Sequence, residues 1–267
     1  MIQLSPLDLA LAALLVCLSA ALTHALRLAT AGRLLISAGR AFVQLLVVGL
    51  LLKLLFEQAG IAWVMAFALV MLAIAGYEIH ARQHRAFAGG WGYGIGTVAM
   101  FLSSFTVTFL ALAVIINPDP WYTPQYAIPL LGMLLGNTMT GIAIALDRLT
   151  QSAHDKRGII EARLSLGQSW RDAISDIRAD SMRAGMIPTI NAMAAAGVVS
   201  LPGMMTGQIL AGTPPLEAVK YQIMILFMIA AGTIFGTIGA IWAASRRLFD
   251  PRERLRLDRL SIPQERS

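Results

Sequence analysis

The sequence is poor in charge and in cysteine. Only 13% of its 267 residues are charged, whereas 57% are hydrophobic and the mean hydropathy is +0.68. So little charge cannot cover the surface of a soluble globule of this length, which excludes an ordinary soluble protein. Because Cys17 is the single cysteine, a disulfide and a multi-cysteine metal site within the chain are excluded as well.

Motifs for ATP hydrolysis and for nucleophilic catalysis are also missing. The chain has no Gly-x-x-x-x-Gly-Lys-Ser/Thr loop, so it cannot by itself be a P-loop ATPase. Its four histidines are dispersed, and neither Ser165 nor Ser200 has a His/Asp grouping nearby in the sequence. We therefore expect no catalytic residue and no cofactor in this chain.

Long apolar runs, in contrast, are abundant. A hydrocarbon core of about 30 Å requires helices of about 17–25 apolar residues. Seven such runs lie near residues 7–26, 34–56, 61–79, 94–116, 128–146, 187–211 and 221–244. The sequence predicts an all-α transmembrane protein with about seven spanning helices, organised as one membrane domain over residues 1–267.

The distribution of basic residues predicts the orientation. When alternate loops are assigned to opposite sides of the membrane, 19 of the 21 Lys and Arg residues fall on one side, and only Lys53 and Lys220 fall on the other. Basic loops stay in the cytoplasm, so we expect the N-terminus outside and the C-terminus inside, in a bacterial inner membrane. The basic residues are dispersed over three loops and a tail, which favours contact with anionic lipid and gives no reason to invoke nucleic acid.

The longest polar loop, residues 147–185, is predicted to lie in the cytoplasm between the fifth and sixth spans. Ser169 is a candidate helix N-cap with Asp172 three residues later. The run from residue 170 to 182 then places Trp170, Ala173 and Ile177 on one helical face and charged residues largely on the other. This pattern predicts an amphipathic helix that lies along a membrane surface.

Residues 161–167 of this loop, Glu-Ala-Arg-Leu-Ser-Leu-Gly, resemble the coupling loop through which ABC permeases contact their ATPase subunits. With residues 136–139 upstream and 200–212 downstream, nearly the whole chain is similar to the FetB-type iron-export ABC permeases, a family that includes plant aluminium-tolerance transporter subunits. Arg163 stands where the broader importer motif has a second alanine, which weakens the inference of an importer. The residues that match the coupling loop or flank it are Glu161, Ala162, Gly167, Trp170 and Arg171.

The resemblance implies a permease subunit that exports iron or another metal. A separate ABC ATPase would bind ATP and Mg and hydrolyse the nucleotide, and the permease would act as a homodimer. Two alternatives stay open, an ABC permease for a nucleotide sugar or other small solute and an ATP-independent secondary transporter. The second requires intramembrane carboxylates as ion relays, and the predicted spans lack Asp and Glu away from their ends.

Polar residues within the spans are candidates for a translocation route. Arg40 and Gln44 recur at helical spacing in the second run, and Glu78 and Asp147 are the candidate partners of Arg40 in a pair that could act as a gate. The alternative is that Arg40 has a structural role or extends to the lipid headgroups. Glycine and proline interrupt the sixth run, and broken helices often line a substrate path. The remaining candidates for the route are Asn137, Asn191, Met204, Met205 and Gln208. An alternative is that the methionines fill gaps between helices.

A metal-entry site is harder to support. His80 and His84 lie four residues apart with Glu78 nearby, so all three can share one end of a helix. Two histidines do not make a site, and Arg82 and Arg85 would repel cations. An interfacial loop without metal is the alternative interpretation of these residues.

Overall fold

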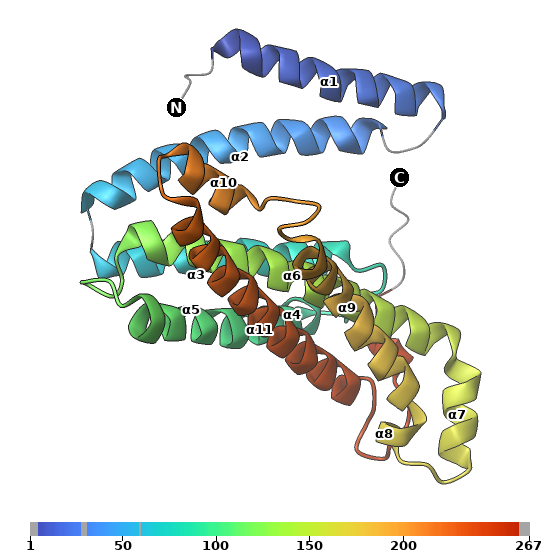
Figure 1. Ribbon diagram of the computed structural model, residues 1–267. Helices are drawn as coiled ribbons and strands as arrows, with labels where there is room; N and C mark the ends of the chain where they lie inside the picture. Colours follow the sequence, from blue (N-terminus) through green and yellow to red (C-terminus); the bar gives the residue numbers. More distant parts are fainter. Residues whose placement is uncertain (1–4, 28–30, 59, 262–267) are drawn as a thin grey trace. The chain divides into compact units, whose positions relative to one another are not determined.

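The computed structural model describes residues 5–27, 31–58 and 60–261, and the regular elements of these residues are helices (Figure 1). The chain forms two compact units, residues 1–59 and 60–267. The all-α prediction is confirmed. The prediction of one membrane domain over 1–267 stays a prediction.

The first unit consists of two helices that pack against each other, α1 (Pro6–Ala25) and α2 (Ala31–Gln58). A capping box begins α1: the Asp8 backbone N–H donates to the Ser5 hydroxyl at 3.3 Å, and the Ser5 backbone N–H donates to the Asp8 carboxylate at 2.8 Å. These bonds satisfy amides that the start of a helix leaves without partners.

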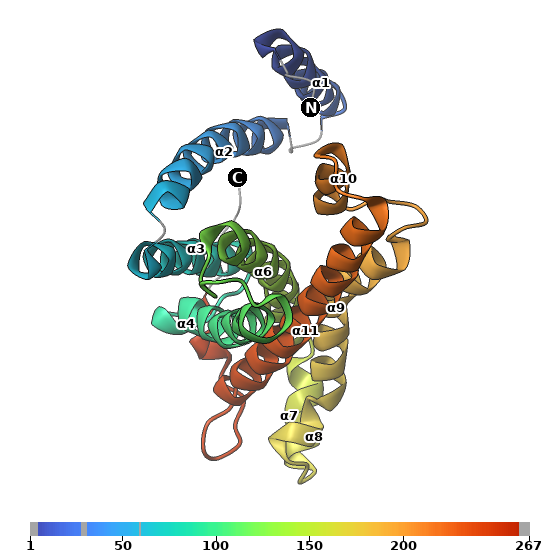
Figure 2. The same ribbon diagram turned by 60° about the vertical axis from the view of Figure 1, so that its left-hand side comes forward.

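The second unit is built around α6 (Pro124–Asp155), which has buried positions along most of its length and packs most extensively against three other helices (Figures 1 and 2). These are α3 (Ile61–Arg82), α9 (Ser175–Ala195) and α11 (Pro215–Arg247). The helical run from Gly90 to Ile116 packs against α3 and α11, and consists of α4 (Gly90–Met100), η1 (Phe101–Phe105), α5 (Thr106–Leu110) and η2 (Ala111–Ile116). Both η segments are π-helical, a form that widens the helix locally.

Helices α6, α9 and α11 approach each other at glycines. A Cβ atom placed on Gly185 of α9 would lie 2.5 Å from the Gly141 carbonyl oxygen of α6, and one placed on Gly236 of α11 would lie 2.7 Å from Thr138 Cγ2. Such contact is possible only where no side chain separates the backbones. Gly232 and Gly236 of α11 thus form a packing face against α6 within the chain.

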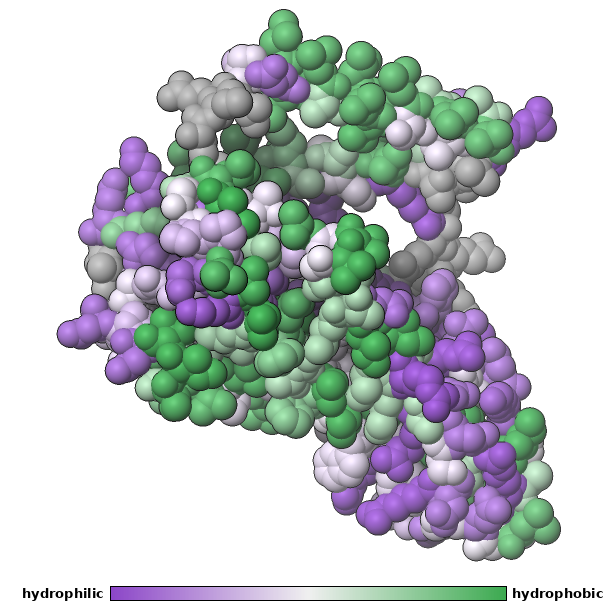
Figure 3. All heavy atoms as spheres, viewed as in Figure 1, coloured by the Kyte–Doolittle hydropathy of each residue, from purple (hydrophilic) through white to green (hydrophobic). Residues whose placement is uncertain are grey.

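The two kinds of surface are separated in space (Figure 3). Large apolar side chains such as Leu69, Phe109, Phe227 and Phe235 are exposed along the helices of the second unit. Hydrophilic residues are densest at the lower right of the view, around α7 (Arg157–Ser165) and α8 (Trp170–Ala173) (Figure 3). An apolar exposed belt of this kind is stable in hydrocarbon and not in water.

Six helices among the described residues are long and apolar enough to cross a membrane, and they correspond to six of the seven predicted runs. They are Pro6–Ala25, Ala31–Glu57, Ile61–Arg82, Gly90–Ile116, Pro124–Asp155 and Pro215–Arg247.

The structure differs at residues 187–211, which do not form one spanning helix. Helix α9 ends at Ala195, a turn follows, and α10 (Gly203–Leu210) begins after Pro202. The turn forms because Gly197 has a φ of +80° and the Ser200 backbone N–H donates to the Ala195 carbonyl at 3.1 Å. The break therefore precedes the Pro202-Gly203 pair at which the sequence predicted it.

The polar loop is also shorter than the predicted range of residues 147–185. Helix α6 continues to Asp155 and α9 begins at Ser175, so only residues 156–174 connect them. The predicted amphipathic helix over 170–182 is divided at Ile174, which ends α8, and its second part belongs to the long helix α9.

Replacing Gly185 with Ala tests the close crossing. We expect Gly185→Ala to destabilise the protein by about 1–3 kcal/mol, the usual effect of overpacking, because the new methyl group meets the Gly141 backbone. The matched control is Gly136→Ala on α6, where an added Cβ has no neighbour within 4 Å. Thermal melting in detergent measures both, and equal melting temperatures for the two variants would contradict the proposed packing.

Candidate functional site: the surface at the α7–α8 turn

The α7–α8 turn is a Schellman motif that requires glycine. Helix α7 ends at Ser165, and the Gly167 and Gln168 backbone N–H groups donate to the Leu164 and Arg163 carbonyls at 3.0 and 3.2 Å. This pattern closes a helix through a residue in the left-handed region, and Gly167 has a φ of +87°. The α7–α8 turn thus has a defined geometry, and it leaves Leu166 84% exposed at its tip.

Helix α8 begins as the sequence predicted. The Asp172 backbone N–H donates to the Ser169 hydroxyl at 3.3 Å, and that hydroxyl donates to the Asp172 carboxylate at 2.6 Å. The expected apolar face is also present, because Ala173, Ile174 and Ile177 are buried. Its side chains belong to the core of the second unit, so the turn is anchored to the helical bundle.

Arg163 joins α7 to α8 and α9. Its guanidinium donates to both carboxylate oxygens of Asp176, at 2.8 and 3.3 Å, and to the Ala173 carbonyl at 2.9 Å. The hydrogen bond from Arg163 lowers the pKa of the Asp176 carboxyl below its ordinary value, and the same bond raises the pKa of Arg163. Arg163, the residue that departs from the importer motif, therefore connects α7 to the other side of the turn.

The other predicted coupling residues occupy this surface. Glu161 and Ala162 are exposed on α7, and Glu161 accepts a hydrogen bond from Arg157 Nε at 2.8 Å. Trp170 is half-buried with Arg171 over its ring, 5.5 Å from the ring centroid. One surface thus carries all five residues.

Sequence reasoning missed the C-terminal segment, which it treated as a basic tail. Residues 248–256 form a tight hairpin: the Arg256 backbone N–H donates to the Leu248 carbonyl at 2.8 Å, and Asp250 accepts from the Arg252 and Arg254 backbone N–H groups at 2.9 and 3.0 Å. The bond from the Arg254 N–H is the largest cause that lowers the pKa of Asp250. The Asp250-Pro251 pair, a typical turn signal, could have revealed it.

The C-terminal segment contacts the α7–α8 turn through the hairpin and the loop after α3 through the residues that follow the hairpin. The Trp170 ring lies 5.6 Å from that of Phe249, and the Trp170 backbone N–H donates to the Glu253 carboxylate at 3.0 Å. Further along, the Ala88 backbone N–H donates to the Arg259 carbonyl at 2.8 Å. The turn, the hairpin and the α3–α4 loop are thereby linked.

The candidate metal residues at the end of α3 are not assembled into a ligand set. Glu78 pairs with Arg82 at 3.7 Å, and the His84 backbone N–H donates to Asp147 at 2.6 Å. His80 is half-buried beside Gly92. Over residues 5–27, 31–58 and 60–261, no group of three or more His, Cys, Asp or Glu side chains could hold a metal ion.

The candidate route residues lie on four helices. Arg40 and Gln44 belong to α2 in the first unit. The pairing of Arg40 with Glu78 or Asp147 stays a prediction. Asn137 of α6 and Asn191 of α9 are both exposed, and each lies beyond the Gly141–Gly185 crossing on the side away from the α7–α8 turn. The remaining three, Met204, Met205 and Gln208, are half-buried on α10.

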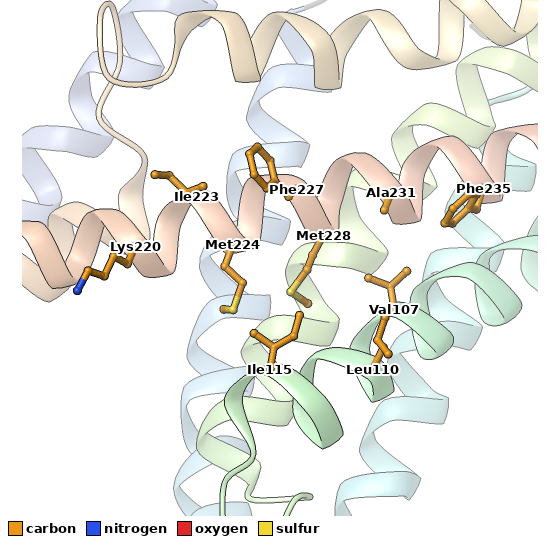
Figure 4. Close-up of a pocket in the computed structure, with 10 residues that line it drawn as sticks. All are labelled: Val107, Leu110, Ile115, Lys220, Ile223, Met224, Phe227, Met228, Ala231 and Phe235. Carbon is orange, nitrogen blue, oxygen red and sulfur yellow. The ribbon is translucent and has the colours of Figure 1, made fainter.

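An apolar pocket of about 540 Å³ lies elsewhere, between α11 and the α5–η2 segment (Figure 4). Met224, Met228 and Phe227 of α11 line it together with Leu110 and Ile115, and Lys220 is the single charged residue among its walls. Hydrocarbon and thioether walls offer little to a hydrated cation. None of the candidate route residues lines this pocket.

Comparisons with known proteins show the family to which the chain belongs. A family model described as "Uncharacterised protein family (UPF0014)" matches residues 6–249. The chain is 38% identical over 228 residues to the UPF0014 membrane protein slr1647 of Synechocystis, with 84% of this chain and 86% of that protein covered. It is 32% identical over 256 residues to the probable iron export permease protein FetB of Escherichia coli, with 93% of each chain covered.

A plant protein is similar over much the same region. Protein ALUMINUM SENSITIVE 3 of Arabidopsis thaliana is 31% identical over 226 residues, which cover 84% of this chain and 81% of that protein. No solved structure matches the chain.

The Arg163–Asp176 pair should make stability depend on pH. Because the pKa of Asp176 is lowered in the folded protein, the pair contributes stability above the ordinary carboxyl pKa of about 4 and loses it as the pH falls further. We expect Asp176→Asn to lower the melting temperature at pH 7, and the difference from the wild type to shrink as the pH falls below about 4 toward the lowered pKa of Asp176.

The control for this pair is Arg183→Ala, which removes a more exposed partner of Asp180 and should change little at either pH. If the difference between Asp176→Asn and wild type is the same at pH 7 and pH 3, the carboxylate does not contribute through its charge.

Proposed function

Because the chain belongs to the UPF0014 family of membrane proteins, we propose that it is the membrane-spanning permease subunit of an ABC transporter that exports iron or another metal. A separate ATPase subunit would hydrolyse the ATP. The family resemblance predicted from the sequence is confirmed, and the relative named as a probable iron export permease supports the metal assignment.

The observation that carries the proposal is the exposed α7–α8 turn. Leu166 is an apolar side chain at the tip of a polar, charged end of the molecule, where an isolated leucine has nothing to cover it. A single exposed leucine is common on protein surfaces, so the proposal depends on the turn carrying the residues that match the coupling loop, Glu161, Ala162 and Gly167. The turn is rigid because the Schellman bonds and Arg163 hold it, so a partner that binds there moves the helices with it.

Helix α9 connects this surface to the interior. Its 21 residues, about 30 Å of helix, run from the end of α8 to the break at residues 196–202, cross α6 at Gly185 and include Pro188, whose missing N–H removes one hydrogen bond of the helix. A displacement at α8 would therefore be carried along α9 to the region of Asn191, Met204 and Met205. Thioether and amide groups bind a metal weakly, which suits release.

The partners follow from this mechanism. ABC ATPases close in pairs around ATP and Mg, so two copies of the permease would each present one turn to one ATPase. The charge asymmetry supports a cytoplasmic turn and C-terminus, an external N-terminus and a location in the bacterial inner membrane.

Hydrolysis by the copurified complex tests the proposal. We expect Fe²⁺ to stimulate ATP hydrolysis of the reconstituted permease–ATPase complex and UDP-glucose, the nucleotide-sugar probe, to leave it unchanged. Gly167→Val should reduce the stimulation at least tenfold, because a β-branched residue does not adopt the φ of +87°. The control is Gly158→Ala on α7, where an added Cβ has no neighbour within 4 Å.

Stimulation by the sugar alone would assign the transporter to nucleotide sugars. Transport by the permease without any ATPase would show a secondary transporter instead.

The orientation is tested separately by labelling. In a Cys17→Ser background, we expect the thiol of Ser165→Cys to react with a membrane-impermeant maleimide only after the cytoplasmic side is opened, because the site lies on the proposed cytoplasmic surface. Labelling of intact spheroplasts from outside would refute a docking site for a cytosolic ATPase.

A further inference from the structure

A polar groove lies directly beside the α7–α8 turn. It has a volume of about 620 Å³ and two walls from distant parts of the sequence. One wall is the end of α7 and the following turn, and the other is the C-terminal hairpin. The lining residues are Glu161, Leu164, Ser165 and Gln168 on the first wall and Arg252, Glu253, Arg254 and Leu255 on the second.

Resting on the proposed function, we infer that the ATPase docks on a composite surface in which the C-terminal hairpin forms the second half, with the groove receiving a polar segment of the ATPase. The groove is continuous with the proposed docking tip because it shares Glu161 and Ser165 with α7. A partner that covers Leu166 therefore reaches the hairpin as well.

Glu253 is the residue that joins the two walls. It has a φ of +58°, in the left-handed region that favours glycine, and its carboxylate nevertheless accepts the first backbone N–H of α8 at 3.0 Å. Strained residues of this kind persist where the side chain has a role that glycine cannot fill. Here the carboxylate fixes the hairpin against the start of α8.

The hairpin wall is preformed. The side chain of Asp250 is only 5% exposed, and it accepts hydrogen bonds from two backbone N–H groups and from Arg254 Nε at 2.8 Å. Hydrogen bonds between residues 86–88 and residues 259–261 fix the segment that follows the hairpin. A rigid wall loses little conformational freedom on binding, which favours affinity for a partner.

The charges indicate what the bound segment carries. Three charged residues of the groove already have partners. Glu253 accepts a hydrogen bond from the Trp170 backbone N–H. Arg254 is paired with Asp250, and Glu161 is paired with Arg157. Arg252 lines the groove, and its side chain has no ion-pair partner among the residues that the structure describes. The bound segment of the ATPase would therefore present a carboxylate to Arg252.

Photocrosslinking from single cysteines tests the inference on the full complex. Cys17→Ser removes the only cysteine, and benzophenone maleimide is then attached at Leu166→Cys, Arg252→Cys or Glu217→Cys. Glu217 is the control because it lies at the opposite end of the 33-residue α11. We expect adducts with an ABC ATPase, identified by peptide sequencing, from positions 166 and 252 and none from position 217.

The outcomes separate the two proposals. Adducts from position 166 without any from position 252 overturn the composite surface and leave the proposed function intact. Adducts from neither position overturn both, and adducts from position 252 with lipid or a second permease copy alone also overturn the inference.

A pair of charge variants gives an independent readout. We expect Arg252→Glu to lower the amount of copurified ATPase at least tenfold and Arg252→Lys to retain it, since lysine keeps the charge. Equal retention by both variants would show that Arg252 meets no carboxylate.

Discussion

The second unit depends on the contact of backbones at the crossing of α6, α9 and α11. In hydrocarbon, apolar side chains gain little by leaving lipid, so helices associate through close packing and not through the hydrophobic effect. Gly141, Gly185 and Gly236 permit that packing because they have no side chain at the points of closest approach. The same crossing fixes where α9 passes α6, and hence where the α7–α8 turn stands with respect to the interior.

The polar end of the molecule is organised differently, through directed bonds. Glycine closure at Gly167, the guanidinium of Arg163 and the carboxylate of Glu253 each connect segments that lie in water, where hydrogen bonds must compete with solvent. Because several such bonds act on one turn, its shape is determined although each bond is modest. A stiff end attached to a closely packed bundle is what the transfer of motion from a partner would require.

Elements that depend on neighbouring residues could be predicted from the sequence, whereas contacts between residues far apart in the sequence could not. Six apolar runs, the Ser169 cap and the buried face of Trp170–Ala173 follow from hydropathy and helical periodicity, so they could be predicted. The break after Ala195 could not be placed, because it depends on the conformation of Gly197, which local composition does not determine. The roles of Arg163 and Glu253 depend on partners 13 and 83 residues away. Nothing in their immediate neighbourhood reveals these partners.

The π-helical segments η1 and η2 give the run from Gly90 to Ile116 a tolerance for single-residue changes in length. In a regular α-helix each residue advances the direction of the side chain by about 100°, so removing one residue rotates every later side chain by that angle. A π-helical turn holds one residue more than an α-helical turn, because its bonds run between residues five apart, so the loss of one residue within Phe101–Phe105 can be absorbed by conversion of that turn to α-helix. Val107 and Ile115 would then keep their direction toward α11.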